Sequence, residues 1–313
     1  VGQFYHINAD NDYPYNLYGG MQDNGSWVGP AYVLKDQGIR NSYWQELMFG
    51  DGFDVVPDPK DNRFGYAMSQ EGYVGRYDRE TGLAKGIKPT HPDPDVILRF
   101  NWNSAIAMDP FDNETIYFGS QFVHKSTDKG DTWKVISPDL STNDPNKQKQ
   151  GESGGLTMDA TGAENHTTVL VIEPSPLEAN MLWAGTDDGH LQYTNNGGKN
   201  WTNLSANIWA AGVPKFAWIS SIELSSKNPN RVYVTLDNHA YGDHATYVVV
   251  SNDAGKTWKK FTSKEFTGFA HVIREDLVQE NLLFLGTEMG LFISIDAGAT
   301  WMRSKYQNIP WYA

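Results

Sequence analysis

The sequence lacks cysteine altogether, which excludes disulfides and thiolate metal sites. It is also poor in basic residues, with 25 Lys and Arg against 38 Asp and Glu and a net charge of −13. This balance works against nucleic acid or an anionic membrane surface as the main partner. The apolar runs at 168–172 and 282–285 are far shorter than the ~18 residues that a membrane span needs. Neutral glycans or basic protein surfaces fit the composition better.

Motifs of nucleotide and acyl-transfer chemistry are missing as well. The sequence has no Gly-rich phosphate loop and no Gly-x-Ser-x-Gly elbow. We therefore expect no cofactor.

One short phrase occurs four times, in a chain with 30 glycines and 13% aromatic residues. Each copy holds a hydroxyl residue, an Asp or Asn, a Gly and a Trp at fixed spacing. The four sets are Ser126, Asp128, Gly130 and Trp133; Thr194, Asn196, Gly198 and Trp201; Ser251, Asp253, Gly255 and Trp258; and Ser294, Asp296, Gly298 and Trp301.

The phrase predicts a tight turn between two strands. Its Asp or Asn side chain is placed to accept backbone N–H groups, and its Gly is suited to positive φ. A group needed in every repeat is typical of a structural unit. We therefore expect Asp128, Asp253 and Asp296 to be turn residues and not catalysts.

These residues resemble the Asp-box, or bacterial neuraminidase repeat, of sialidases, xyloglucan-degrading glycoside hydrolases and sortilin-type propellers. The wider phrasing at 18–27, 100–104, 185–189, 272–276 and 285–290 is similar to large secreted bacterial proteins described as sortilin-like or glycosyl hydrolases. The resemblance implies an all-β propeller and an extracellular, cell-surface or periplasmic location.

Alignment of the repeats around the phrase predicts a single domain of four-stranded blades over 1–313. Six blades are visible, and we expect them to belong to a propeller of six to eight blades or more, with at least one blade outside this chain. The expected units are a partial first blade at 1–47, blades at 48–88, 99–138, 166–205, 216–262 and 266–310, and an insertion at 139–165. Insertions of this length are usually functional or disordered, and the sequence leaves both readings open.

The predicted strand order places the turns between second and third strands on one side of the disc, together with the connections that lead into the inner strands. Aromatic rings stack on pyranose faces, and acids bind sugar hydroxyls, so this side suits a glycan. The candidate binding residues on it are Trp27, Trp102, Trp218, Glu71, His166, His271 and Glu288.

Carboxyl groups on the same side are candidates for glycosidase chemistry. A retaining mechanism needs two carboxyls about 5–5.5 Å apart, and an inverting one about 6.5–9.5 Å. The candidates are Glu164, Asp187, Asp188, Asp23 and Asp51. Asp23 and Asp51 are also ordinary turn formers, because each is close to a glycine.

Sialidase activity and a metal site have weaker support in the sequence. Sialidases need an Arg triad and an Arg-Ile-Pro motif, neither of which this sequence provides. Asp237, His239, Asp243 and His244 contain the side-chain types of a zinc site, but such loops are common without metals. We therefore expect no bound metal.

The sequence thus favours a binding module for a protein or polysaccharide, without direct membrane insertion. The alternatives are a glycoside hydrolase that uses a carboxylate pair on the same face, and a passive scaffold within a larger assembly.

Overall fold

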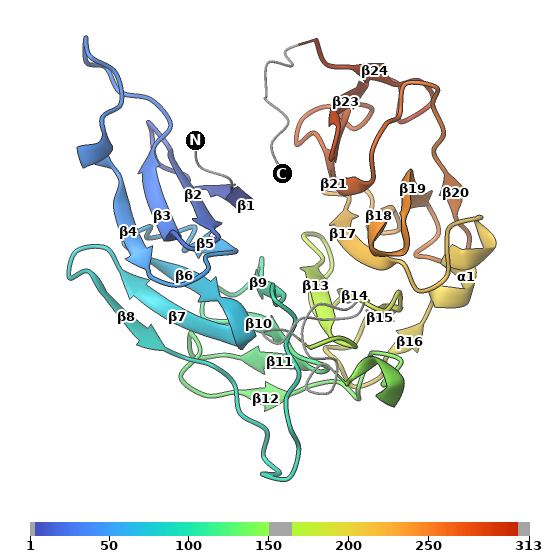
Figure 1. Ribbon diagram of the computed structural model, residues 1–313, viewed down its shortest axis with the longest axis horizontal. Helices are drawn as coiled ribbons and strands as arrows, with labels where there is room; N and C mark the ends of the chain where they lie inside the picture. The colour runs from blue at the N-terminus through green and yellow to red at the C-terminus, as the bar shows by residue number, and fades with distance from the viewer. Residues whose placement is uncertain (1–3, 150–164, 306–313) are drawn as a thin grey trace.

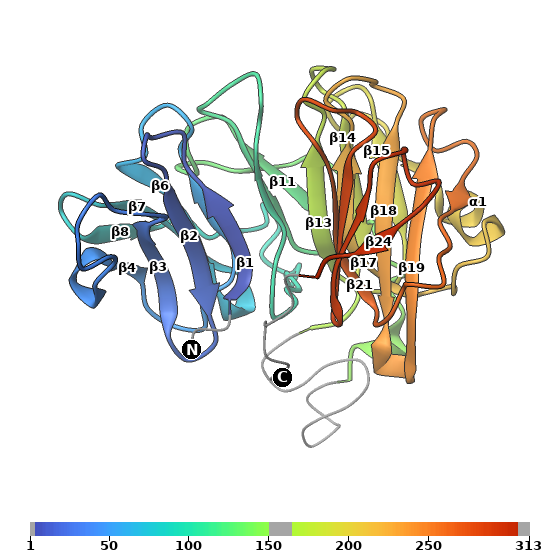
Figure 2. The ribbon, with the colours of Figure 1, turned by 90° about the horizontal axis from the view of Figure 1, so that it is seen from above.

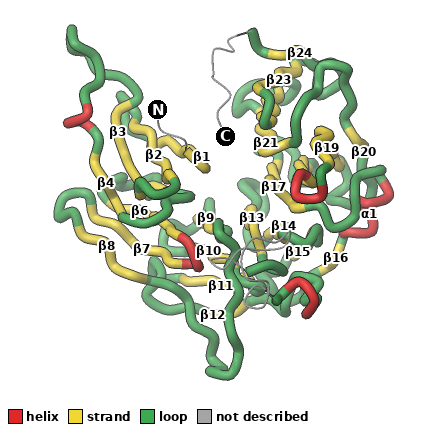
Figure 3. The backbone as a smooth tube through the Cα atoms, viewed as in Figure 1, coloured by secondary structure: helices red, strands yellow, loops and turns green. Residues whose placement is uncertain are grey.

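The computed structural model describes residues 4–149 and 165–305, which form six four-stranded antiparallel sheets around a common axis (Figure 1). Within each sheet the strands are paired in chain order, and the first strand lies nearest the axis. The predicted all-β propeller is therefore confirmed. Figure 3 shows that helix is confined to short segments outside the sheets.

The first three sheets lie between residues 4 and 135. Sheet one contains β1 (Phe4–Ala9), β2 (Asn16–Met21), β3 (Gly25–Pro30) and β4 (Gln45–Met48). Sheet two contains β5 (Val55–Pro57), β6 (Phe64–Ser69), β7 (Tyr73–Asp78) and β8 (Leu83–Gly86). Sheet three contains β9 (Ile106–Met108), β10 (Ile116–Gly119), β11 (Val123–Ser126) and β12 (Lys134–Val135). The short helices η1 (Asn41–Tyr43) and η2 (Gln70–Gly72) lie within the first two units.

The other three sheets follow η3 (Pro145–Lys147). Sheet four contains β13 (Val169–Pro174), β14 (Leu182–Thr186), β15 (Leu191–Thr194) and β16 (Thr202–Asn203), followed by α1 (Ser205–Ala210). Sheet five contains β17 (Trp218–Leu224), β18 (Val232–Asn238), β19 (Asp243–Ser251) and β20 (Lys259–Lys260), and the short helix η4 (His239–Tyr241) lies between β18 and β19. Sheet six contains β21 (Ala270–Glu275), β22 (Leu283–Thr287), β23 (Gly290–Ser294) and β24 (Met302–Arg303).

The first unit, which the sequence suggested to be partial, has all four strands. Its inner strand β1 pairs with β2, and Ile7 lies opposite Gly19. The repeated phrase is absent from this unit, as it is from the unit at 48–88.

Each repeated phrase forms the turn between the third and fourth strands of its sheet. In the copy at 251–258, Asp253 accepts hydrogen bonds from the Ser251 hydroxyl (2.8 Å), the Thr257 N–H (2.9 Å) and the Thr257 hydroxyl (2.6 Å). Gly255 has a φ of 81° and donates its N–H to Ser251 Oγ. The Thr257 and Ser251 donors stabilise the ionised form and lower the pKa of Asp253 to about 2.

The other copies repeat this geometry. Asp128 and Asp296 accept the same three bonds, and Asn196 accepts the hydroxyl of Thr194 and the N–H of Asn200. The carboxylates of the phrase therefore accept hydrogen bonds within their own turns.

The hydrophobic core lies between the sheets. Each of five clusters of buried apolar side chains joins two consecutive sheets. In one of them, Trp183 of β14 packs with Ile219 and Ile222 of β17. In two copies of the repeated phrase the tryptophan also bonds to the preceding sheet: Trp133 donates its indole N–H to the carbonyl of Ile87, and Trp201 donates to that of Ile136. Trp258 instead donates to the carbonyl of Gly255 in its own turn.

Three charged side chains meet where consecutive inner strands adjoin. Glu173, Glu223 and Arg274 hold equivalent positions in β13, β17 and β21. Arg274 Nη1 donates to Glu223 Oε2 at 2.8 Å. Burial raises the pKa of Glu173 to about 8, against the attraction of Arg274 and with the help of the Glu223 charge.

We predict that Asp253→Ala lowers the Tm of thermal unfolding by circular dichroism, because the Thr257 and Ser251 donors lose their acceptor. Asp253→Asn should lower Tm less, since an amide oxygen holds the same turn at Asn196. The control is Lys256→Ala, which changes an exposed neighbour. Equal Tm values for all three variants would contradict the role of Asp253.

We predict that Glu173→Gln flattens the dependence of stability on pH. Burial raises the pKa of Glu173 from its ordinary value of 4.5 to about 8, so between these values the folded protein retains a proton that the unfolded chain releases. Stability contributed by the neutral form is complete below about 4.5 and falls as pH rises towards about 8. Chemical denaturation from pH 4 to 9 measures this. Glu178→Gln, at an exposed turn residue, is the control; identical profiles for wild type and Glu173→Gln would refute the prediction.

Candidate ligand-binding face

The strand order divides the loops between two sides of the disc. Figure 2 shows the strands running from one side to the other. The turns between second and third strands share one side with the connections that lead into the inner strands, and we call this side the candidate face. The repeated turns and the turns between first and second strands lie on the opposite side.

Asp187 and Asp188 lie at the end of β14, and both are fully buried. Asp187 accepts the N–H of Thr168 (2.9 Å), the hydroxyl of Thr168 (2.7 Å) and the side-chain amide of Asn101 (2.8 Å). Asp188 accepts the N–H and the hydroxyl of Thr142 at 2.7 and 2.6 Å and the hydroxyl of Thr186 at 2.5 Å. Both carboxylates therefore tie loops together and are closed to a substrate.

His166 is buried beside Asp187, with Nδ1 lying 3.5 Å from Asp187 Oδ2. Burial disfavours the charged ring, but the carboxylate of Asp187 outweighs it and raises the pKa of His166. His166 therefore lies buried beneath the candidate face, next to Asp187, and is not exposed to a ligand.

Asp51 and Asp23 form a second loop contact. Asp51 is buried, and its carboxylate accepts the N–H of Asp23 at 2.6 Å. Asp23 adopts a φ of 58° in the turn before β3, and its own side chain is exposed. Glu71 has a φ of 60° in η2 and is also exposed. Glu164 lies outside the described residues.

Two of the predicted aromatic residues lie among other side chains. Trp27 in β3 is half-buried and donates its indole N–H to the carbonyl of Asn24. Trp102 is half-buried and packs edge-on against Phe53 in the core between sheets two and three. Neither presents an open ring platform.

The third predicted tryptophan begins a row of rings across sheets five and six, whose inner strands β17 and β21 are neighbours (Figure 1). The ring of Trp218 lies 6.4 Å from His239, which stacks on Phe269 at 4.6 Å. Phe269 lies 5.0 Å from His271, whose Nε2 lies 3.1 Å from Glu288 Oε2. We call Trp218, His239, Phe269, His271 and Glu288 the aromatic row. Its histidines and Glu288 are exposed.

More exposed rings lie near by. Phe216 and Tyr241 are each 43% exposed, and Lys147 of η3 reaches both: its Nζ lies 5.9 Å from the ring centre of Phe216 and 5.8 Å from that of Tyr241. Lys147 Nζ also donates to the Tyr241 hydroxyl at 3.1 Å. Lys147, near the start of the insertion, therefore contacts both aromatic rings of sheet five's loops.

The polar side chains of the histidine-rich turn in sheet five form contacts within that sheet. Asp237 accepts from the N–H of His239 and contacts its Nδ1 at 2.7 Å, which raises the pKa of His239. Asp243 instead accepts from Asn238 and from the Tyr247 hydroxyl. His244 lies against Phe269. Within residues 4–149 and 165–305, no three His, Asp or Glu side chains are grouped to hold a metal ion.

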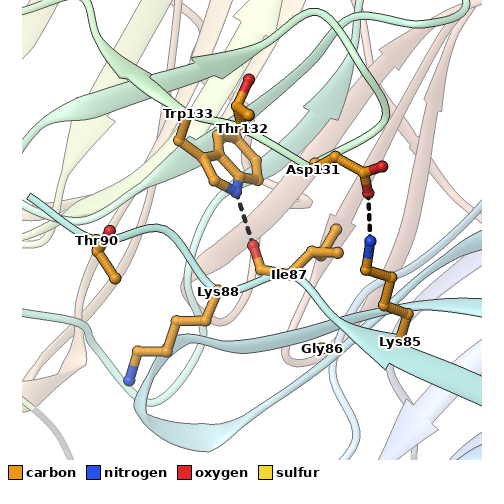
Figure 4. Close-up of a pocket in the computed structure, with 9 residues that line it drawn as sticks. Lys85, Gly86, Ile87, Lys88, Thr90, Asp131, Thr132 and Trp133 are labelled. Carbon is orange, nitrogen blue, oxygen red and sulfur yellow. Dashed lines mark hydrogen bonds and ion pairs between the residues drawn. The ribbon is translucent and has the colours of Figure 1, made fainter.

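A polar groove of about 360 Å³ lies where β8 meets the repeated turn of sheet three (Figure 4). Lys85 Nζ forms an ion pair with Asp131 at 2.9 Å, and Trp133 donates to the carbonyl of Ile87 at 2.7 Å. The polar groups that face one another across the groove are thus already paired. It is a seam between consecutive sheets, apart from the candidate face.

Sequence reasoning placed Trp218, His271 and Glu288 on this face and the structure brings them into one row. It missed Phe269, Phe216 and Tyr241, and it placed His239 in a metal loop. Phe269 directly precedes β21, and Phe216 lies two residues before β17, so aromatic residues next to inner strands were the available signal.

Neither protein-family models nor curated proteins give a match to this chain. Among solved structures, the fold is similar to the crystal structure of the Niastella koreensis GH74 enzyme. The TM-score is 0.64 at 15% identity, and the match covers 96% of this chain and 45% of that one. This chain therefore spans less than half the length of that structure, and at this identity the similarity shows the propeller fold alone.

Proposed function

We propose that the chain is a binding module that holds a polysaccharide on the aromatic row and on the neighbouring rings of Phe216 and Tyr241. The observation that carries this proposal is the row in which half-buried Trp218 and exposed His239 and His271 lie around the buried ring of Phe269. The row lies on a face whose central carboxylates, Asp187 and Asp188, are buried and hydrogen-bonded. Rings of this kind stack on the apolar faces of sugars, and the polar edges of His271 and Glu288 suit sugar hydroxyls.

The charge of the chain agrees with an uncharged ligand. A net charge of −13 disfavours polyanions, including nucleic acids and strongly acidic glycans. A neutral polysaccharide meets no such repulsion. A protein partner with a basic surface is the other ligand compatible with this balance.

The sequence resemblance to Asp-box and sortilin-like proteins supports an extracellular, cell-surface or periplasmic role. The geometry of the four repeated turns is compatible with that resemblance. In the described residues no helix has the length and hydropathy to cross a membrane. A propeller in such a location fits a subunit of a larger secreted or surface-attached assembly.

The alternative is a glycoside hydrolase that acts within the same face. The similarity to the GH74 enzyme fold supports it at the level of architecture. Among the four sequence-proposed carboxyls that lie within the described residues, Asp23 is exposed and the other three are buried, so Asp23 is the described candidate for this chemistry. A second exposed acid on the face, Glu71 or Glu288, would have to serve as its partner.

We predict that Trp218→Ala and Phe216→Ala each weaken polysaccharide binding about tenfold, the equivalent of about 1.4 kcal/mol, because each removes a stacking ring. A neutral-polysaccharide array would find the ligand and calorimetry the Kd. Phe111→Ala is the matched control, since Phe111 is exposed but lies in the turn between β9 and β10, on the opposite side. Equal losses in all three variants, or no binding to any polysaccharide, would contradict the proposal.

We predict that the chain releases no reducing sugar from the same polysaccharides. The assay should include Asp23→Asn, with Asp131→Asn as a control at an exposed acid of a repeated turn. Product release that disappears in Asp23→Asn and persists in Asp131→Asn would replace the binding module with the hydrolase.

A further inference from the structure

The aromatic residue at one position of the second strand is buried in five sheets and not in the sixth. In each sheet this residue pairs with the equivalent position of the inner strand. Tyr18, Tyr66, Tyr117, Trp183 and Tyr233 are all at most 2% exposed. Their equivalent in sheet six, Phe284, is only half-buried. Sheet six therefore lacks the neighbour that covers this position elsewhere.

The third strand shows the same difference. Val74, Val123, Leu191 and Val248 hold one equivalent position and are at most 3% exposed. Leu291 of β23 holds that position in sheet six and is 37% exposed. Ile293 is half-buried, and Met302 of β24 is exposed. We call Phe284, Leu291, Ile293 and Met302 the outer face of sheet six.

Sheet one also has an apolar position that no neighbouring sheet covers, in its inner strand. Val55, Ile172, Ile222 and Ile273 hold one position of the inner strands and are at most 3% exposed, because the preceding sheet covers them. Ile7 is their equivalent in β1 and is 60% exposed. No cluster of buried apolar side chains joins sheet six to sheet one within the described residues. Figures 1 and 2 show these sheets standing apart.

We propose that one further four-stranded sheet packs between sheet six and sheet one and covers both faces. This inference is independent of the proposed function. The existing interfaces indicate which residues the added sheet would present. Sheet six packs on sheet five through small, branched and aromatic apolar residues, namely Ala270, Ile273, Leu283, Leu285 and Phe292. The added sheet presents residues of the same kinds to the outer face of sheet six.

The arrangement of the molecule favours a single sheet over a second copy of the chain. Six sheets already surround the axis. A whole second copy that continued the same packing around that axis would overlap the first. One sheet meets both exposed faces at once, and ring closure of this kind is how propellers cover the faces of their first and last sheets.

The test uses the absence of cysteine, because one introduced thiol is then the only one in the protein. Leu291→Cys and Ile7→Cys report on the two faces. Val248→Cys, which is buried, and Ile295→Cys, which is exposed in a repeated turn, are the controls. The rate of reaction with a water-soluble disulfide reagent is measured for each variant in the 313-residue chain. It is then measured in the same chain extended after Ala313 by a copy of residues 269–305, a sheet already shown to pack on such a face.

In the 313-residue chain, Leu291→Cys and Ile7→Cys should react as fast as Ile295→Cys. In the extended chain both should slow at least tenfold, while Ile295→Cys stays fast and Val248→Cys stays slow. Either thiol staying fast in the extended chain overturns the proposal. Protection in the 313-residue chain also overturns it, and light scattering then separates direct closure of sheet six on sheet one from a second copy.

A fast Val248→Cys in the extended chain would mean that the extension had disturbed the fold. The same four variants are then measured in a chain extended by a copy of residues 216–260, whose first strand also packs on a preceding sheet. The rates in that chain decide the proposal by the same criteria.

Discussion

The structure depends on the packing of apolar sheet faces against each other. A four-stranded sheet of this size has two apolar faces and cannot cover either by itself. Each interface therefore joins the second and third strands of one sheet to the inner strands of the next, as Tyr233 and Val248 pack against Ala270 and Ile273. Burial of such side chains stabilises by about 25 cal/mol per Å² of apolar area, which makes these interfaces the main source of stability.

The sequence was informative wherever a local rule operates in every repeat. Asp128, Asp253 and Asp296 have donors within four residues of themselves, so their structural role followed from spacing alone. Strand order followed from the same repeats. The sequence predicted a partial blade at 1–47, whereas the structure shows that this unit has all four strands.

The candidate site was less predictable, because its geometry depends on contacts between loops far apart in the chain. Asp187 and Asp188 resemble exposed turn acids in the sequence, but Asn101 and Thr142 bring donors from more than 40 residues away and bury them. No local pattern encodes that. Trp218, by contrast, begins an inner strand, where strand order alone places it on the candidate face. Its ring neighbours depend on the packing of sheet six beside sheet five, which spacing in the sequence does not describe.

The sequential strand order within every sheet also bears on how the chain folds. All pairings within a sheet join strands that are consecutive in the chain, so each sheet forms through short loop closures with a small entropic cost. β-hairpins form in about 1–10 μs, whereas docking of sheets waits for pairs of completed units. A chain built this way assembles by addition of neighbours, as solenoid repeats do, and its cooperativity rests on the interfaces between units.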